Sequence, residues 1–166
     1  MPRMTVISQD KVPQPYEALL AHDSDMTRTL ERYVGDRAVL RPLSMFLSGA
    51  SYFRRVLLVQ ESSGRPAALG AIRVRLDSFA PGLRARILEG RVPLGRILLE
   101  NRFAYTSKVR ALFAVEPTPE IMGMFWMPKS KVLYGRRNEM FCDKTKIADI
   151  VEILPPLPKA RAKASR

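Results

Sequence analysis

Apolar residues at helical spacing predict a helix early in the chain. Leu30 and Val34 lie four residues apart, so both face the same side of a helix. Asp25 or Thr27 can begin this helix, because a short oxygen-bearing side chain accepts hydrogen bonds from the free amides of the first turn. We therefore predict a helix over residues 26–34. Shorter helices are expected over residues 16–20 and 81–89.

From residue 38 onward the pattern changes to the two-residue period of β-strands. Ile72 and Val74 share one face of their segment, while Arg73 and Arg75 share the other. Turn-forming residues separate successive segments of this kind, which predicts antiparallel neighbours. About six antiparallel strands with a few helices indicate an α+β fold. The expected strands cover residues 38–47, 52–60, 66–76, 132–141 and 146–154, and residues 97–115 are expected to be extended.

Proline and charge divide the chain into three parts. Residues 1–15 are expected to form an irregular N-terminal arm, because three prolines interrupt them. Residues 16–156 contain the predicted elements and form one domain, which suits a chain of 166 residues. Residues 157–166 form a basic tail that we expect to be disordered. Within the domain, three prolines in residues 116–131 predict a loop or flap.

The composition excludes several classes of protein. One cysteine permits no intramolecular disulfide and no cysteine-based zinc site, and one histidine permits no histidine-rich metal centre. The sequence contains no phosphate-binding glycine motif and no HExxH motif, which argues against nucleotide enzymes and zinc hydrolases. Its apolar runs are far shorter than the roughly 20 residues of a membrane span, and the N-terminus lacks an apolar signal segment. We therefore expect a cytoplasmic protein without a membrane partner.

The net charge of +12 suggests an anionic partner. Nucleic acid is one candidate, and a small polyanionic substrate is another. Four of the twelve net charges lie in the basic tail, which leaves eight for the rest of the chain. No predicted helix gathers its basic residues on one face, and no strand shows the aromatic-plus-basic motif of RNA-binding sheets. We therefore expect no nucleic-acid partner.

Two charged residues interrupt otherwise apolar strands and are candidates for chemistry. Arg54 alternates with Val56 and Leu58, and Glu152 lies within the apolar segment IVEILPP. A charge that faces a core must be paired or must bind something. A buried arginine fits a carboxylate, since its planar fork donates two parallel hydrogen bonds. A glutamate in such surroundings suits an acid or a partner for a hydroxyl group.

Structural interpretations of the same residues remain open. Arg54 can be an edge or rim residue, and Glu152 can face solvent or form an ion pair with Arg54. Arg136 and the arginine after it are more typical of a solvated face than of a site. The methionines and tryptophan of residues 122–127 are more typical of packing than of a cofactor site. We interpret His22 as incidental.

Four motifs follow one another along the chain and resemble those of a known enzyme family. They are SDMTRTLE at 24–31, FRRVLLV at 53–59, VPLGRIL at 92–98, and YGRRNEMF at 134–141, the last followed by IVEILPP at 150–156. Together they resemble the bacterial chorismate pyruvate-lyases, which convert chorismate to 4-hydroxybenzoate and pyruvate. The similarity spans most of residues 16–156.

The resemblance implies a fold, an activity and a set of site residues. The fold would be an antiparallel sheet with helical flaps over a buried cavity, and the enzyme would use no metal or cofactor. Arg54 would hold the ring carboxylate together with a backbone amide at Leu94. Glu152 would reach the hydroxyl end of the ligand, and Met26 would line the cavity. Arg54 and Glu152 would then be the catalytic residues of a lyase, which we expect to be a monomer with chorismate as substrate and 4-hydroxybenzoate as product.

The chain departs from the family pattern at one position of the third strand. Ala71 stands where the lyases have an arginine, and Arg73, two residues further on, is the candidate substitute.

The alternative to a lyase is a non-catalytic domain of the same fold that binds or senses a small aromatic acid, as the effector-sensing domains of some bacterial transcription regulators do.

Overall fold

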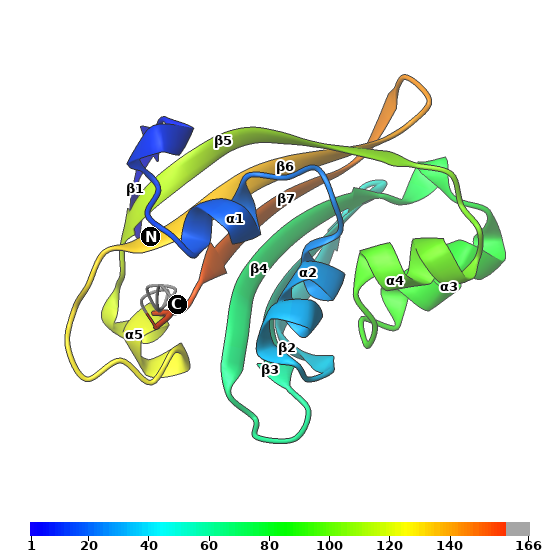
Figure 1. Cartoon of the computed structure of the whole chain (residues 1–166). Helices are drawn as coiled ribbons and strands as arrows, with labels where there is room; N and C mark the ends of the chain where they lie inside the picture. Colours follow the sequence, from blue (N-terminus) through cyan, green and yellow to red (C-terminus); the bar gives the residue numbers. More distant parts are fainter. Residues whose placement is uncertain (159–166) are drawn as a thin grey trace, which may run out of the picture.

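The computed structural model describes residues 1–158, and in that range it has the predicted α+β architecture with seven strands in one open antiparallel sheet (Figure 1). The strand order across the sheet is β1-β5-β6-β7-β4-β3-β2. The strands are β1 (Arg3–Ile7), β2 (Ala38–Ser48), β3 (Ser51–Gln60), β4 (Pro66–Arg75), β5 (Thr106–Glu116), β6 (Leu133–Cys142) and β7 (Thr145–Leu154). The helices are α1 (Tyr16–Leu20), α2 (Met26–Val34), α3 (Pro81–Leu88), α4 (Leu94–Glu100) and α5 (Pro119–Met124), with short 3₁₀ turns η1 (Gln9–Lys11) and η2 (Leu76–Ser78).

The sheet is built from two groups of strands that follow one another along the chain. Strands β2, β3 and β4 form one antiparallel meander, and β5, β6 and β7 form another. The pairing of β4 with β7 joins the two groups in the middle of the sheet. Side chains alternate between the faces along each strand, so every second residue of β3, β4, β6 and β7 points to the same face.

Helices cover the two faces of the sheet unequally. Helices α1 and α2 pack on one half of one face, and α3 with α4 packs on the other half of that face. We call this the inner face. Helix α5 and the loop after it pack on the opposite, outer face, which they cover in part (Figure 1). The inner face is therefore enclosed by helices that come from separate parts of the chain.

Helix α2 has the bounds that the sequence predicts. The Asp25 side chain accepts a hydrogen bond from the backbone amide of Arg28, and Gly35 ends the helix in the left-handed conformation with φ of 70°. Met26 and Leu30, four residues apart, are both buried against the sheet. The cap and the apolar face are both local features, which explains why a single sequence suffices to locate this helix.

Three segments differ from the prediction. Helix α5 lies within residues 116–131, which were expected to form a loop or flap, and Pro119 occupies its first turn, where proline is tolerated. Helix α4 begins at Leu94 and is followed by β5, whereas an extended chain was expected over residues 97–115. Helix α4 buries Ile97 and Leu98 completely, and so short an apolar run has no period that distinguishes a helix from a strand. In the N-terminal arm, β1 pairs with β5, because the prolines flank this strand and do not interrupt it.

The division into arm, domain and tail stays a prediction. Most of the basic tail, residues 159–166, lies outside the described residues, and so does its expected disorder. Among residues 1–158, no helix combines the length and the apolar character that crossing a bilayer requires.

Candidate functional site

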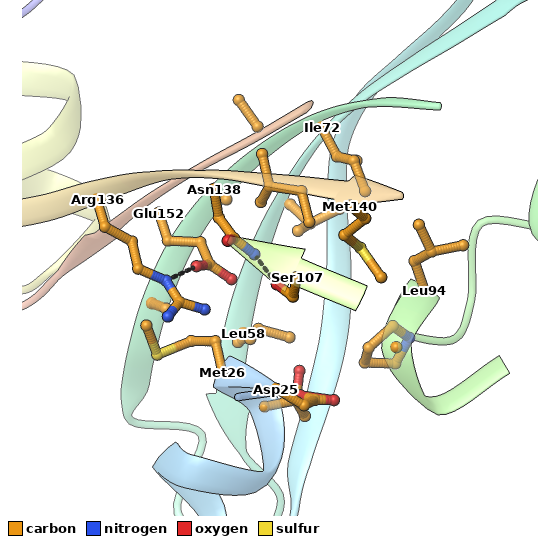
Figure 2. Close-up of a pocket in the computed structure, with 18 of the residues that line it drawn as sticks. Asp25, Met26, Leu58, Ile72, Leu94, Ser107, Arg136, Asn138, Met140 and Glu152 are labelled. Carbon is orange, nitrogen blue, oxygen red and sulfur yellow. Dashed lines mark hydrogen bonds and ion pairs between the residues drawn. The ribbon is translucent and has the colours of Figure 1, made fainter. Parts of the chain in front are cut away.

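A cavity lies between the inner face of the sheet and the starts of α2 and α4 (Figure 2). All four residues that the sequence analysis assigned to a ligand line it: Met26, Arg54, Leu94 and Glu152. Its volume is about 90 Å³. An apolar cavity of roughly 150 Å³ can hold a benzene molecule, so a one-ring ligand fits here only if the walls move apart. The structure thus brings the predicted residues together, while their roles remain predictions.

Arg54 is a buried cation with incomplete hydrogen bonding. Strand β3 directs it to the inner face, where its side chain is only 4% exposed. Its Nη2 donates to the backbone carbonyl of Val92 at 3.1 Å, just before α4. Its Nε and Nη1 are buried without a hydrogen-bond partner in residues 1–158. We call Nε and Nη1 the open donors of Arg54.

Burial changes the electrostatics of Arg54. Loss of contact with water lowers the pKa of the guanidinium below its ordinary value. Arginine nevertheless stays protonated in proteins, because its ordinary pKa is far above neutral pH. The site therefore contains a permanent positive charge in an apolar wall, with two donors available to an anion.

A second buried arginine, Arg136, has its polar groups fully engaged. Its Nε donates to Oε2 of Glu152 at 2.6 Å, as Figure 2 shows. Its Nη1 donates to the carbonyl of His22 at 2.7 Å, and its Nη2 to the carbonyl of Ser24 at 3.4 Å. The side chain is 1% exposed, so the interpretation of Arg136 as part of a solvated face is wrong. Glu152 has its ion pair with Arg136, and the expected alternative of a pair with Arg54 is wrong as well.

Arg136 was not predicted as a site residue, although the sequence carries a signal for its inward position. Arg136, Asn138 and Met140 alternate along β6, and the cavity is lined by all three. Because side chains alternate along a strand, an apolar Met140 that faces the core predicts that Arg136, four residues earlier, faces the core as well. The arginine after it, Arg137, does lie on the outer face, where it pairs with Glu139 and Asp149.

Asn138 is the other missed residue. It is 3% exposed, and its Nδ2 donates to Oγ of Ser107 on β5 at 2.6 Å (Figure 2). Its Oδ1 is buried and accepts no hydrogen bond from residues 1–158. We call this oxygen the open acceptor of Asn138. The alternation that places Arg136 inward also places Asn138 inward, but the sequence does not show that its oxygen lacks a donor, because that depends on the neighbouring strands.

The remaining walls are largely apolar. Met26 and Leu94 are both buried at the first positions of α2 and α4 (Figure 2). Asp25 adds a carboxylate next to them, and it packs closely on Gly95, where an added Cβ would lie 2.5 Å from its Oδ2. The glycine thus lets the two helix starts approach each other beside the cavity.

Arg73 does not take the place of the missing third-strand arginine. The cavity is lined by Ile72, and Arg73 points to the outer face by alternation. There its Nε donates to Oγ of Ser51 at 3.1 Å, and its guanidinium lies 5.7 Å from the ring centroid of Phe53.

His22 has a structural role beside the cavity. Its Nδ1 accepts from the backbone amide of Ser24, which makes Nε2 the protonated nitrogen that donates to the carbonyl of Leu19. Burial, with a smaller contribution from the charge of Arg136, lowers the pKa of the imidazole. The neutral ring therefore helps to shape the loop that Arg136 holds against the sheet.

The described residues offer no group of three or more histidine, cysteine, aspartate or glutamate side chains that could hold a metal ion. The features of the cavity are a permanent cation with open donors, a neutralised ion pair, an open acceptor and apolar walls. This combination suits the binding of a small organic anion.

Comparisons with known proteins give a fold but no sequence relative. No family model matches the chain, and no curated protein matches it. The structure of PhnF from Mycobacterium smegmatis matches with a TM-score of 0.58 at 10% identity, over 86% of this chain and 70% of that one. The ligand-binding domain of a putative GntR-family transcriptional regulator from Bordetella bronchiseptica matches with a TM-score of 0.50 at 17% identity, over 70% of this chain and 85% of that one.

The expectation that the chain is an enzyme, a chorismate pyruvate-lyase, is contradicted by these neighbours. One of these fold neighbours is the ligand-binding domain of a putative transcriptional regulator and not a lyase. The prediction of the fold class is confirmed: the chain has the chorismate lyase-like α+β fold, with an open antiparallel sheet and few helices.

Proposed function

We propose that the chain is a non-catalytic binding domain for a small organic acid, with a one-ring aromatic acid as the expected ligand. The observation that carries this proposal is Arg54, a buried cation that lines an apolar cavity and has two donors without a partner in residues 1–158. Burying an unpaired charge is costly, and a protein retains such a residue where a partner of opposite charge completes it. A carboxylate matches the arginine fork in both geometry and charge.

The walls of the cavity indicate the rest of the ligand. Met26, Leu58 and Ile72 present apolar surface, which favours a hydrocarbon body behind the carboxylate. The volume of about 90 Å³ limits that body to one ring, and the walls must move apart to admit it. The Bordetella neighbour is the ligand-binding domain of a regulator, and we infer a sensing role of the same kind for this chain.

Calorimetric titration with benzoate and with benzamide tests this function. The two probes have the same shape, but only benzoate carries the charge that Arg54 would bind. We expect benzoate to bind and benzamide to bind at least tenfold more weakly, since a hydrogen bond to a charged group contributes about 1.5–3 kcal/mol. Equal binding of the two probes, or no binding of benzoate, would contradict the proposal.

Two matched variants assign the effect to the cavity. Arg54→Met keeps the approximate volume of the side chain and removes the charge, so it should weaken benzoate binding at least tenfold. Arg55→Met changes the next residue of β3, which is exposed on the outer face and pairs with Glu120, and it should leave binding unchanged. Chorismate incubated with the wild-type protein should be recovered without formation of 4-hydroxybenzoate.

A further inference from the structure

The open acceptor of Asn138 is a second unmet hydrogen-bonding position in the same cavity. A buried carbonyl oxygen without a donor is costly, and most such groups in native proteins are satisfied. Asn138 is only 3% exposed, so bulk water does not reach its side chain freely. A ligand in the cavity is therefore a candidate for the missing donor.

The orientation of the Asn138 amide is set by its neighbour. Its Nδ2 donates to Oγ of Ser107 at 2.6 Å, which leaves Oδ1 as the atom available to a ligand. The site consequently presents an acceptor at this position. A ligand atom that only accepts hydrogen bonds would meet another acceptor there and be repelled.

Strand register places Asn138 and Arg54 at opposite ends of one row of inward residues. Arg54 pairs with Ile72, Ile72 with Ile150, and Ile150 with Asn138. All four residues line the cavity. Three strand spacings, about 14 Å in total, separate the two end strands, and two side chains and a one-ring ligand can bridge that span.

The neighbouring ion pair of Arg136 and Glu152 is a weaker candidate for accepting a hydrogen bond from a ligand. The guanidinium of Arg136 already donates to Glu152 and to two backbone carbonyls, and Glu152 is neutralised by that contact. Asn138 is uncharged and has an oxygen with no donor in the described chain. The side chain of Glu152 is 13% exposed, so water can serve its second oxygen, whereas the buried oxygen of Asn138 depends on a ligand for a donor. This difference favours Asn138 over Glu152 as the residue that recognises the far end of a ligand.

We propose that Asn138 is a specificity-determining residue, which accepts a hydrogen bond from a hydroxyl or amino group of the ligand at the end away from its carboxylate. The ligand class is then a one-ring acid with a hydrogen-bond donor opposite the acid group. This proposal rests on the proposed function, because Arg54 must hold the carboxylate for the far end to reach Asn138.

Four probes test the proposal by calorimetry: benzoate, 3-hydroxybenzoate, 4-hydroxybenzoate and 4-methoxybenzoate. In the wild-type protein, the better of the two hydroxybenzoates should bind at least fivefold more tightly than benzoate, and 4-methoxybenzoate should bind more weakly than benzoate. In Asn138→Leu, which has a similar volume, benzoate should still bind while the preference for the hydroxyl falls to within twofold. Circular dichroism should show that the variant is folded.

A second variant tests the orientation of the amide and covers the case in which Asn138→Leu fails to fold. Ser107→Ala removes the contact that fixes Nδ2, so the amide can rotate and present a donor. Discrimination against 4-methoxybenzoate should then decrease at least threefold. Unchanged discrimination in this variant would overturn the proposal.

The outcomes separate this proposal from the one on which it rests. If benzoate binds but a hydroxyl group gives no gain, or if Asn138→Leu keeps the full preference, Asn138 is not the specificity residue and the proposed function stands. If neither benzoate nor the hydroxybenzoates bind the wild-type protein, the proposed function itself is wrong, and the role of Asn138 is overturned with it.

Discussion

Two arginines are buried on the inner face, and they differ in what surrounds them. Arg136 places all three of its nitrogens against acceptors, one of them the carboxylate of Glu152. Among residues 1–158, Arg54 has a single acceptor, the carbonyl of Val92, and its Nε and Nη1 have none. A paired buried charge holds neighbouring parts of the structure together, whereas an incompletely paired one is available to a ligand. We therefore assign Arg136 to the fold and Arg54 to binding.

The structural role of Arg136 predicts a large loss of stability when it is removed. Arg136→Met would leave Glu152 as an uncompensated buried charge and would free the loop at His22 and Ser24 from the sheet. We expect the free energy of unfolding to fall by about 3–5 kcal/mol. Urea denaturation measures this quantity.

The neighbouring residue supplies the control for this prediction. Arg137→Met removes an arginine whose side chain is 48% exposed, and exposed ion pairs contribute about 0–1 kcal/mol. Similar decreases in the free energy of unfolding for the two variants would show that Arg136 does not hold the loop to the sheet.

The loop between α1 and α2 is the element whose stability should depend on pH. The pKa of His22 is lowered in the folded protein by burial, so the unfolded chain takes up a proton at a higher pH than the folded chain does. The stabilisation of the folded protein by neutral His22 is therefore complete above the pKa of about 6.5 that histidine has in the unfolded chain. It is lost as the pH falls through the lower pKa that His22 has in the folded protein. Protonation of Nδ1 would also remove the acceptor for the Ser24 amide.

We expect the free energy of unfolding to decrease as the pH is lowered from 7 to 5.5, with an uptake of less than one proton on unfolding. His22 is the only histidine in the sequence, so His22→Asn should remove most of this slope while its side-chain oxygen can still accept from Ser24. A slope that persists in the variant would assign the pH dependence to carboxylates instead. Urea denaturation at several pH values makes the comparison.

Local signals in the sequence predict most of the elements, while contacts between elements decide the rest. Helix α2 is predicted over its full length by a cap and an apolar face. The pairing of Arg136 with Glu152 is harder to predict, because a bulge after Met140 shifts the register of the β6–β7 hairpin by one residue. Counting outward from the turn without that bulge would place Val151 opposite Arg136. The burial of Asn138 depends on the same register and on Ser107 of β5.

At the scale of the whole molecule, the architecture explains why Arg54 and Glu152 interrupt otherwise apolar strands. Two meanders joined through β4 and β7 bring Arg54 and Glu152 to one inner face, and the starts of α2 and α4 close over it. The residues resemble those of a lyase, while the Bordetella neighbour in fold is the ligand-binding domain of a putative transcriptional regulator. The net positive charge of the chain suits an anionic ligand, since a field of one sign raises the local concentration of opposite charges.

Thermal unfolding of the wild-type protein and of Arg54→Met, each with and without 4-hydroxybenzoate, tests the central claim most directly. Without ligand, Arg54→Met should be at least as stable as the wild type, because it removes an incompletely paired buried charge. The ligand, at a concentration of about a hundred times its dissociation constant for the wild type, should stabilise the wild-type protein by about 2.7 kcal/mol. It should stabilise the variant by about 1.4 kcal/mol or less, because binding to the variant is at least tenfold weaker. If Arg54→Met is several kcal/mol less stable without ligand, or if the ligand stabilises both proteins equally, Arg54 is a structural residue and the cavity is not an anion site.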